Sequence, residues 1–126
     1  MYRRNPRNKY GAKAVDGFPS RLEKSVYDLL TLRQKAGEIS DIQRQVRCEL
    51  TDAAIATKID FSFVDVGSGQ TIYCEAKGCI TERWNLLKRL WAHYGPGKLE
   101  IWGGTYARPK LVDVIIPKWE KWKWEK

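Results

Sequence analysis

Two acids and one lysine are the residues of this chain whose types and spacing point most directly to chemistry. Asp60 stands in KIDFSF, and Glu75 and Lys77 form an E-x-K pair in YCEAKG. Converging carboxylates can hold a hard divalent ion such as Mg²⁺ beside a phosphate, and the ion lowers the pKa of an attacking water. A lysine there can orient that water or offset negative charge in the transition state. An isolated E-x-K is a weak signal, but this one follows a strand that carries an acid.

A β-hairpin is needed to bring these residues together. Residues 58–66 and 70–77 both read as strands, and Gly67, Ser68 and Gly69 between them are typical of a turn. Because strand side chains alternate, Glu75 shares a face with Lys77. If Asp60 lies opposite Glu75, the loop is Gly67-Ser68, and a glycine in its first position favours a type II′ turn, or a bulge with the same effect. Asp60 and Glu75 carboxylates on opposite faces of the sheet would exclude a metal shared by these two acids.

The preceding helix raises a question about Glu23. Residues 20–36 have an amphipathic pattern that ends at Gly37, and Ser20 and Glu23 have the S-x-x-E spacing of a capping box. A reciprocal cap would turn the Glu23 carboxylate back toward the Ser20 amide, whereas a metal role needs it aimed at the hairpin acids. The local pattern favours the cap. The acids of the hairpin shift the preference to the metal site, with Ser20 as the cap.

The remaining elements complete an α/β (α+β) fold. A strand is expected at residues 42–50 and a helix at 81–94, and the apolar runs 99–102 and 111–116 are typical of strands. The order is helix, three strands, helix, then one or two strands. With 126 residues, the chain is expected to form a single domain. Residues 1–16 form a basic N-terminal arm, and residues 117–126 form a Trp- and Lys-rich tail.

These motifs in this order resemble a known family. Asp60, the E-x-K pair and the helical Glu23 resemble the PD-(D/E)xK nuclease superfamily, although Ile59 stands where that family often has proline. More narrowly, KYGAK, FPSRLE, IDF and EAKG resemble the phage endonuclease I group of junction-resolving enzymes. The similarity extends from Tyr10 to Trp102.

The resemblance implies a restriction-endonuclease-like core, a mixed β-sheet flanked by helices in the order αβββαβ. It also implies a homodimer that cuts branched DNA such as Holliday junctions, with Mg²⁺ or Mn²⁺ as cofactor. Glu23, Asp60 and Glu75 become the metal-site carboxylates, and Lys77 the catalytic lysine. Two alternatives stay open: a nuclease of the same superfamily for flapped, nicked or duplex DNA, and a DNA-binding module without catalysis on the same core.

The charge of the chain also indicates a polyanionic partner. The formal net charge is +8, and clustered Lys and Arg gain affinity by displacing counterions from phosphates. The plainer alternative is a basic surface that binds no partner. For the second helix, the corresponding alternative is a charged face that is simply exposed to solvent. The expected DNA-binding residues are those of the N-terminal arm and the second helix: Arg3, Arg4, Arg7, Lys9, Lys13, Arg83, Lys88 and Arg89.

Three other features bear on the tail, the cysteines and the cellular compartment. The tail PKWEKWKWEK interleaves Trp119, Trp122 and Trp124 with lysines, which suits packing on the core or on a second subunit, or stacking on unpaired bases. The odd set Cys48, Cys74 and Cys79 makes a disulfide framework or a zinc site improbable. The sequence has no apolar run long enough for a bilayer and no secretory signal, so a cytoplasmic protein without membrane partners is expected.

Overall fold

A computed structural model describes residues 17–51, 53, 55–78 and 81–119. It is an α+β fold of two helices and a five-strand mixed sheet in the order αβββαββ. The elements are α1 (Arg21–Lys35), β1 (Ile39–Glu49), β2 (Ala56–Asp65), β3 (Thr71–Ala76), α2 (Glu82–Tyr94), β4 (Leu99–Gly104) and β5 (Pro109–Ile115). Neither α1 nor α2, the helices of the described residues, has the length and apolar character needed to cross a bilayer.

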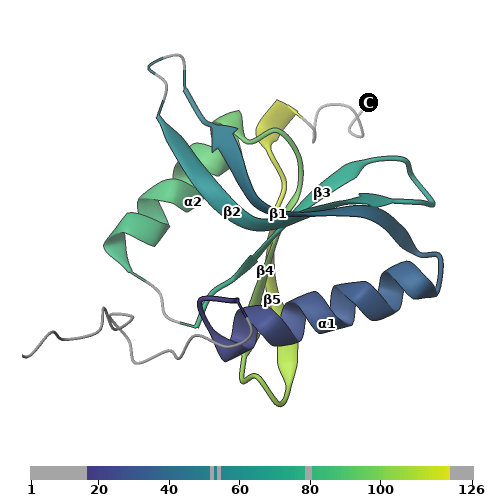
Figure 1. Ribbon diagram of the computed structural model, residues 1–126. Coiled ribbons are helices and arrows are strands. Elements are labelled where there is room, and N and C mark those ends of the chain that lie inside the picture. Colours follow the sequence, from purple (N-terminus) through teal and green to yellow (C-terminus); the bar gives the residue numbers. More distant parts are fainter. Residues whose placement is uncertain (1–16, 52, 54, 79–80, 120–126) are drawn as a thin grey trace, which may run out of the picture.

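The five strands lie in the sheet in the order in which they occur along the chain, β1-β2-β3-β4-β5 (Figure 1). The first three form an antiparallel meander, and β4 then pairs parallel to β3. A parallel neighbour requires a crossover connection, and α2 supplies it. The last strand, β5, returns antiparallel to β4. All seven elements expected from the sequence are present, with ends that differ by a few residues.

Local sequence signals explain where the helices begin and end. The Ser20 hydroxyl accepts a hydrogen bond from the Glu23 amide at 3.1 Å, and the Thr81 hydroxyl accepts one from the Trp84 amide at 3.1 Å. These side chains satisfy amides that have no partner within the helix. Gly37 ends α1 with a φ of +81°, a conformation that glycine adopts without the steric cost of a Cβ atom.

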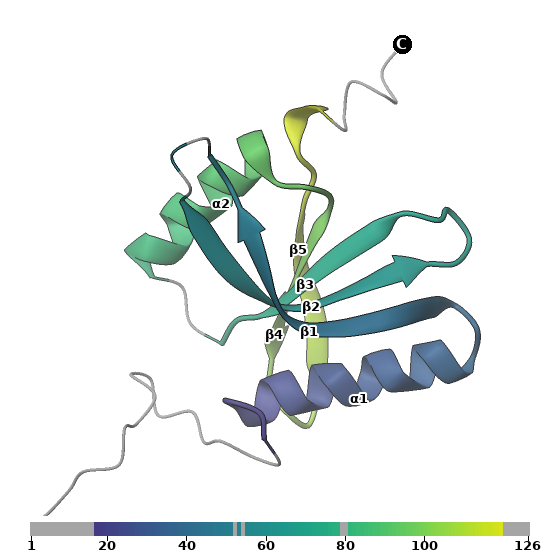
Figure 2. The same ribbon diagram turned by 45° about the horizontal axis from the view of Figure 1, so that its top comes forward.

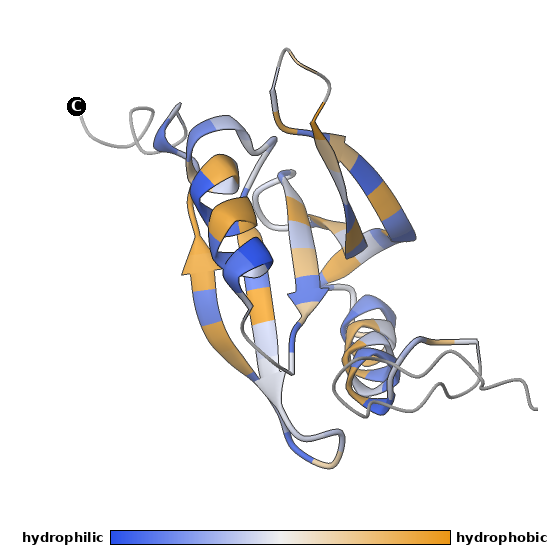
Figure 3. Cartoon of the chain, turned by 90° about the vertical axis from the view of Figure 1, so that its left-hand side faces the viewer, coloured by the Kyte–Doolittle hydropathy of each residue, from blue (hydrophilic) through white to orange (hydrophobic). Residues whose placement is uncertain are grey.

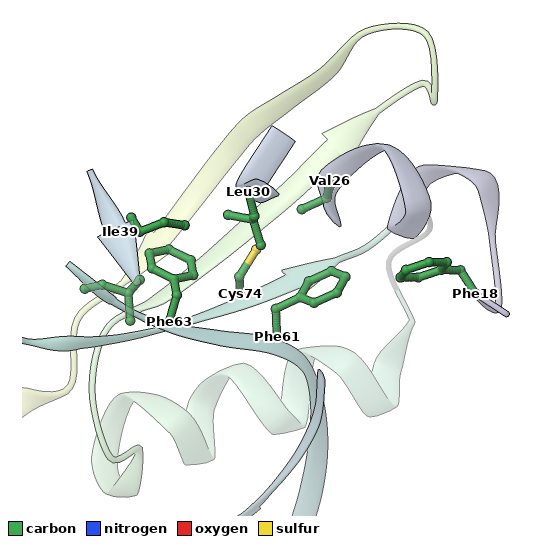
Figure 4. Packing of buried hydrophobic residues seen from close by; sticks show 8 residues of the cluster. Phe18, Val26, Leu30, Ile39, Phe61, Phe63 and Cys74 are labelled. Atoms are coloured by element: carbon green, nitrogen blue, oxygen red, sulfur yellow. The ribbon is translucent and has the colours of Figure 1, made fainter. Parts of the chain in front are cut away.

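Each face of the sheet carries its own apolar core beneath one helix. On the α1 face, Val26 and Leu30 of the helix pack on Phe61, Phe63 and Cys74 of the sheet (Figure 4). On the α2 face, Trp84 and Trp91 pack on a second cluster of buried residues that includes Cys48, Leu50, Ile59, Leu99 and Ile101. Hydrophobic and hydrophilic residues alternate along the strands and helices, as these two buried layers require (Figure 3).

The hairpin register agrees with the prediction, whereas the type of turn does not. Phe61 pairs with Cys74 and Val64 with Thr71, the register that sets Asp60 opposite Glu75. A type II′ turn would need a positive φ at Gly67, but the positive φ of this loop, +71°, belongs to Gly69. The Gly69 amide donates to the Asp65 carbonyl at 2.7 Å. The Asp65 amide also donates to the Gln70 carbonyl at 2.8 Å, so the loop consists of residues 66–69. It exceeds the predicted loop by one residue on each side, which leaves the register unchanged.

The β1–β2 hairpin turns sharply at its middle. Residues 59, 61 and 63 would share one face in a regular strand, yet Phe61 and Phe63 pack beneath α1 and Ile59 packs beneath α2. The same change of side occurs on β1 between Ile42 and Val46. This change from one face to the other lies at the level of Asp60. The regular alternation of side chains between the two faces of a strand therefore does not hold across residues 59, 61 and 63.

Candidate active site

The candidate site lies where β2 separates from β3. Pairing of the two strands ends at Phe61 and Cys74, and the first half of β2 then diverges from the end of β3 (Figures 1 and 2). At the separation, the Ala76 amide donates to the Asp60 Oδ2 at 2.9 Å. A side-chain carboxylate thus takes the place of a backbone carbonyl as the acceptor for this amide. The result is a fork in the sheet with Asp60 at its base.

Asp60 brings the two glutamates together. The carboxyl groups of Glu23 and Glu75 are each within hydrogen-bonding reach of the Asp60 carboxyl. Glu23 comes from the first turn of α1, and Glu75 from β3 on the α2 face of the sheet. Only 4% of the Glu23 surface and 7% of the Glu75 surface are exposed. The fork therefore joins acids from the two sides of the sheet at one largely buried point.

The direction of the Glu23 side chain decides between the two roles set out for it. Ser20 caps α1 through its hydroxyl, as expected. The Glu23 carboxylate interacts with Asp60 and accepts a hydrogen bond from the side-chain amide nitrogen of Gln45 at 3.4 Å. It is therefore turned toward the acids of the hairpin.

The close packing of these acids raises the pKa of both glutamates. Burial is the largest cause for Glu75, followed by the hydrogen bond with Asp60 and repulsion from it, and its pKa rises to about 10. Burial and repulsion by Asp60 raise the pKa of Glu23 to about 8. Carboxylates packed together with few donors favour a bound proton or a bound cation over negative charge. Such a cluster is a feature of functional sites more often than of structural ones.

Lys77 directly follows β3, next to Glu75. The positive charge of Lys77 opposes the rise of the Glu75 pKa, so the two side chains interact electrostatically. The Lys77 amide donates to the Trp102 carbonyl at 2.8 Å, and its Nζ lies 5.1 Å from the centre of the Trp84 ring. The backbone of β4 and the first turn of α2 therefore fix this lysine beside the acids.

Gln45 belongs to the site, although the sequence analysis did not identify it. It lies between the pairs Arg44–Phe61 and Val46–Ile59, level with Asp60, and has a φ of +53°. A left-handed backbone at a residue other than glycine is unfavourable and often accompanies a functional position. Here the left-handed backbone places the side-chain amide of Gln45 against Glu23. It lies at the point where the side chains of β1 and β2 change from one face of the sheet to the other. The regular alternation of polar and apolar residues around Gln45 predicted an ordinary strand, so the sequence offered no signal for it.

The donor set fits a hard divalent cation by its chemistry, although the acids are not yet disposed as ligands. Among the described residues, no three His, Cys, Asp or Glu side chains are arranged so that they could hold a metal ion. The carboxyl groups of Glu23 and Glu75 instead each interact with that of Asp60. Oxygen donors in a buried, electron-rich cluster are what Mg²⁺ or Mn²⁺ selects. To hold it, the glutamates must lose their protons and direct their oxygens to a common point.

The expected DNA-binding residues differ in their surroundings. Arg83 and Arg89 are exposed on α2, whereas the Lys88 Nζ lies 3.4 Å from the Asp113 carboxylate of β5 and is already paired. Trp119 of the tail donates from its indole nitrogen to the Gly95 carbonyl at 2.8 Å, so this tryptophan packs on its own domain. Residues of the N-terminal arm, Cys79 and the tail beyond Trp119 lie outside the described residues. They include Arg3, Arg4, Arg7, Lys9, Lys13, Trp122 and Trp124.

Cys48 and Cys74 are free and buried, one in each apolar core. Burial raises the pKa of both thiols, to about 11 for Cys48 and well above the usual value for Cys74. A thiol that resists ionisation is a poor nucleophile and a poor metal ligand. These two cysteines act as core side chains.

No known protein family, curated protein or solved structure matches the chain.

Proposed function

We propose that this protein is a metal-dependent endodeoxyribonuclease that cleaves branched DNA, with the four-way junction as its substrate. The observation that carries the proposal is the meeting of Glu23, Asp60 and Glu75, with Lys77 beside them, at the fork between β2 and β3. The order αβββαββ contains the helix, hairpin, crossover helix and parallel strand of a restriction-endonuclease-like core. The net charge of +8 suits a nucleic-acid substrate.

In this proposal each residue has a distinct role. Glu23, Asp60 and Glu75 hold Mg²⁺ or Mn²⁺, which when bound polarises the scissile phosphate and lowers the pKa of a water. The Asp60 Oδ2 accepts a hydrogen bond from the Ala76 amide, which fixes Asp60 with respect to the end of β3. Lys77 supplies positive charge beside the phosphate, and the Trp84 ring restricts its motion.

The substrate and the assembly follow from the resemblance of the motifs. Opposed nicks in a four-way junction require two active sites, so the proposed active form is a homodimer. Arg83 and Arg89 of α2 are exposed to flanking phosphates, which would position DNA without reading its sequence. A cytoplasmic location follows for an enzyme that acts on DNA within the cell.

The test compares three DNA substrates under the same conditions. Labelled four-way junction, flap and linear duplex are incubated in equal amounts with the protein and Mg²⁺. Paired symmetric nicks confined to the junction are the expected result. Cleavage of all three DNAs would replace the proposal with a nuclease of broader substrate range. Binding without cleavage, with Mn²⁺ as well as Mg²⁺, would reduce the protein to a DNA-binding module.

A further inference from the structure

A second surface with unassigned chemistry lies where the β4–β5 loop meets the start of α1. We call it the loop surface; it consists of Arg21, Tyr106, Arg108 and Lys110. The Arg21 guanidinium carbon lies 5.1 Å from the centre of the Tyr106 ring, and the Ser25 hydroxyl donates to the Tyr106 carbonyl at 2.6 Å. A side-chain contact and a backbone contact therefore attach the loop to the helix.

The loop that presents Tyr106 is closed by a glycine and by hydrogen bonds within the loop. Gly104 has a φ of +82°, and a Cβ atom there would lie 2.6 Å from the Arg108 carbonyl oxygen, so only glycine fits. The Arg108 amide donates to the Thr105 carbonyl at 3.0 Å and to the Thr105 hydroxyl at 3.2 Å. Tyr106 is thus displayed on a closed turn, which lowers the entropy lost when a ligand binds.

The charges of the loop surface are not neutralised within the described part of the chain. The ion pairs found there use other cations, namely Lys24, Arg33, Arg47 and Lys88. Arg21, Arg108 and Lys110 are exposed and pair with no carboxylate in that part. Tyr106 keeps 54% of its surface exposed although Arg21 lies over its ring. Unpaired cations on the same loop and helix end as an accessible aromatic ring are suited to a nucleic-acid strand, since cations bind phosphates and the ring stacks on a base.

The loop surface adjoins the candidate active site along two stretches of chain. Arg21 begins the helical turn that contains Glu23. Trp102, whose carbonyl accepts the Lys77 amide, precedes Gly103 and Gly104, where the loop starts. Figures 1 and 2 show the connection between β4 and β5 alongside the first turns of α1. A nucleic-acid strand that extends from the acids toward α1 would therefore pass over this surface.

We propose that the loop surface binds one strand of the substrate next to the cleavage site. Arg21, Arg108 and Lys110 contact its phosphates, and Tyr106 stacks on a base at the branch point. A base within a regular duplex is covered on both sides, whereas the branch point interrupts stacking and exposes one. The identification of the nucleic acid as branched DNA rests on the proposed function.

Binding of DNA without cleavage tests this proposal. In EDTA, the fluorescence anisotropy of labelled four-way junction, single strand and linear duplex is titrated with wild type and variants. Tyr106→Leu is expected to weaken binding of the junction and the single strand by about tenfold and of the duplex by less than about twofold. Tyr106→Phe, which keeps the ring, is expected to bind like wild type. The Ser25 contact uses the Tyr106 backbone, so both substitutions retain it.

A matched pair of charge variants tests the phosphate contacts. Arg21→Gln removes a charge at the first residue of α1, and Lys35→Gln removes the same charge at its exposed last residue. Arg21→Gln is expected to weaken binding to all three DNAs and to lower the slope of log affinity against log salt by about 1. Lys35→Gln should change neither quantity measurably.

The outcomes separate this proposal from the proposed function. Two results would refute the proposal that the loop surface binds DNA: wild-type affinity of Tyr106→Leu for the junction, or equal effects of Arg21→Gln and Lys35→Gln on binding. Cleavage assays with Asp60→Asn in Mg²⁺ are run in parallel. Full cleavage by Asp60→Asn would refute the proposed site, while the anisotropy data would still decide whether the loop surface binds DNA.

Discussion

The two ends of the β2–β3 hairpin each hold an aspartate, and their surroundings are opposite. Asp65, at the turn, is partly exposed to solvent, and its carboxylate accepts hydrogen bonds from the Ser68 amide at 3.0 Å and the Ser68 hydroxyl at 2.7 Å. These hydrogen bonds lower its pKa. Asp60, at the fork, meets Glu23 and Glu75 and accepts one backbone amide.

The difference shows how the environment divides the roles of identical residues. At the turn, donors satisfy the charge of the carboxylate, so the acid stabilises the loop and needs no other partner. At the fork, carboxyl groups face one another, and Lys77 and Arg44 offset their negative charge only in part. A divalent ion would supply the positive charge that is missing. The predictions below use pairs of variants to test whether the two ends differ in this way.

Cleavage should separate the two aspartates most strongly. Asp60→Asn and Lys77→Ala are expected to reduce the rate of junction cleavage in Mg²⁺ by about 1,000-fold or more, because each removes charge next to the scissile phosphate. Binding of the junction in EDTA should remain nearly that of wild type. Asp65→Asn, the same substitution on the same strand, should cleave within about twofold of wild type. Full activity of either site variant would remove that residue from the mechanism.

Metal binding gives a readout that does not depend on DNA. Saturating Mg²⁺ should stabilise the folded protein by about 2–3 kcal/mol when its concentration is about 100 times the dissociation constant. Asp60→Asn should lose this increase, and Asp65→Asn should keep it. Thermal unfolding with and without Mg²⁺ measures both. An equal gain in Asp60→Asn would mean that Mg²⁺ binds elsewhere.

The pH dependence of stability tests the mutual repulsion of the acids. The folded protein keeps protons on Glu23 and Glu75 up to pH values near their raised pKa of about 8 and about 10, whereas the unfolded chain releases them near the ordinary value of 4.5. Between these limits the folded state binds more protons, so its stability falls as the pH rises. In EDTA, the melting temperature should fall by about 5 °C or more from pH 5 to pH 8. Glu75→Gln, which cannot ionise, should flatten this slope.

The smallest expected effect concerns Asp65. Its lowered pKa means that the ionised form favours folding, so this contribution is present at neutral pH and is lost as the pH falls through its ordinary value of 3.8. Asp65→Asn should therefore lower the melting temperature slightly at pH 7, and the difference from wild type should shrink in acid. A difference that grows in acid would contradict this account of the turn.

Much of the scaffold could be predicted because its signals are local. Ser20 and Thr81 immediately precede the two helices and accept hydrogen bonds from neighbouring amides, and Gly37 follows the end of α1 by two residues. Short stretches of sequence therefore suffice to place both helices. The register of the hairpin was predicted by placing Asp60 opposite Glu75, and the strands pair in that register. The type of turn was mispredicted because Gly67 and Gly69 can both adopt a positive φ, and the sequence alone does not say which of them does.

The candidate site could be predicted in its residue types but not in its surroundings. The direction of Glu23, the contact of Gln45 with it and the ion pair of Lys88 with Asp113 each join distant parts of the chain. No periodicity encodes them, because they depend on how α1 and α2 lie on the sheet. The separation of β2 from β3 is a further tertiary feature, since the residues on both strands continue a regular strand pattern.

The left-handed residues of β1 also bear on how the sheet ends. β1 and β5 are its edge strands, and β1 has positive φ values at Asp41 and Gln45 together with a register shift after Ser40. These interruptions break the regular row of donors and acceptors that an added strand would need. Within the described part of the chain, the β5 edge is then the one that can accept a strand along its length. A sheet with one such edge can join a second copy once and then closes, so growth into a filament by strand addition is blocked.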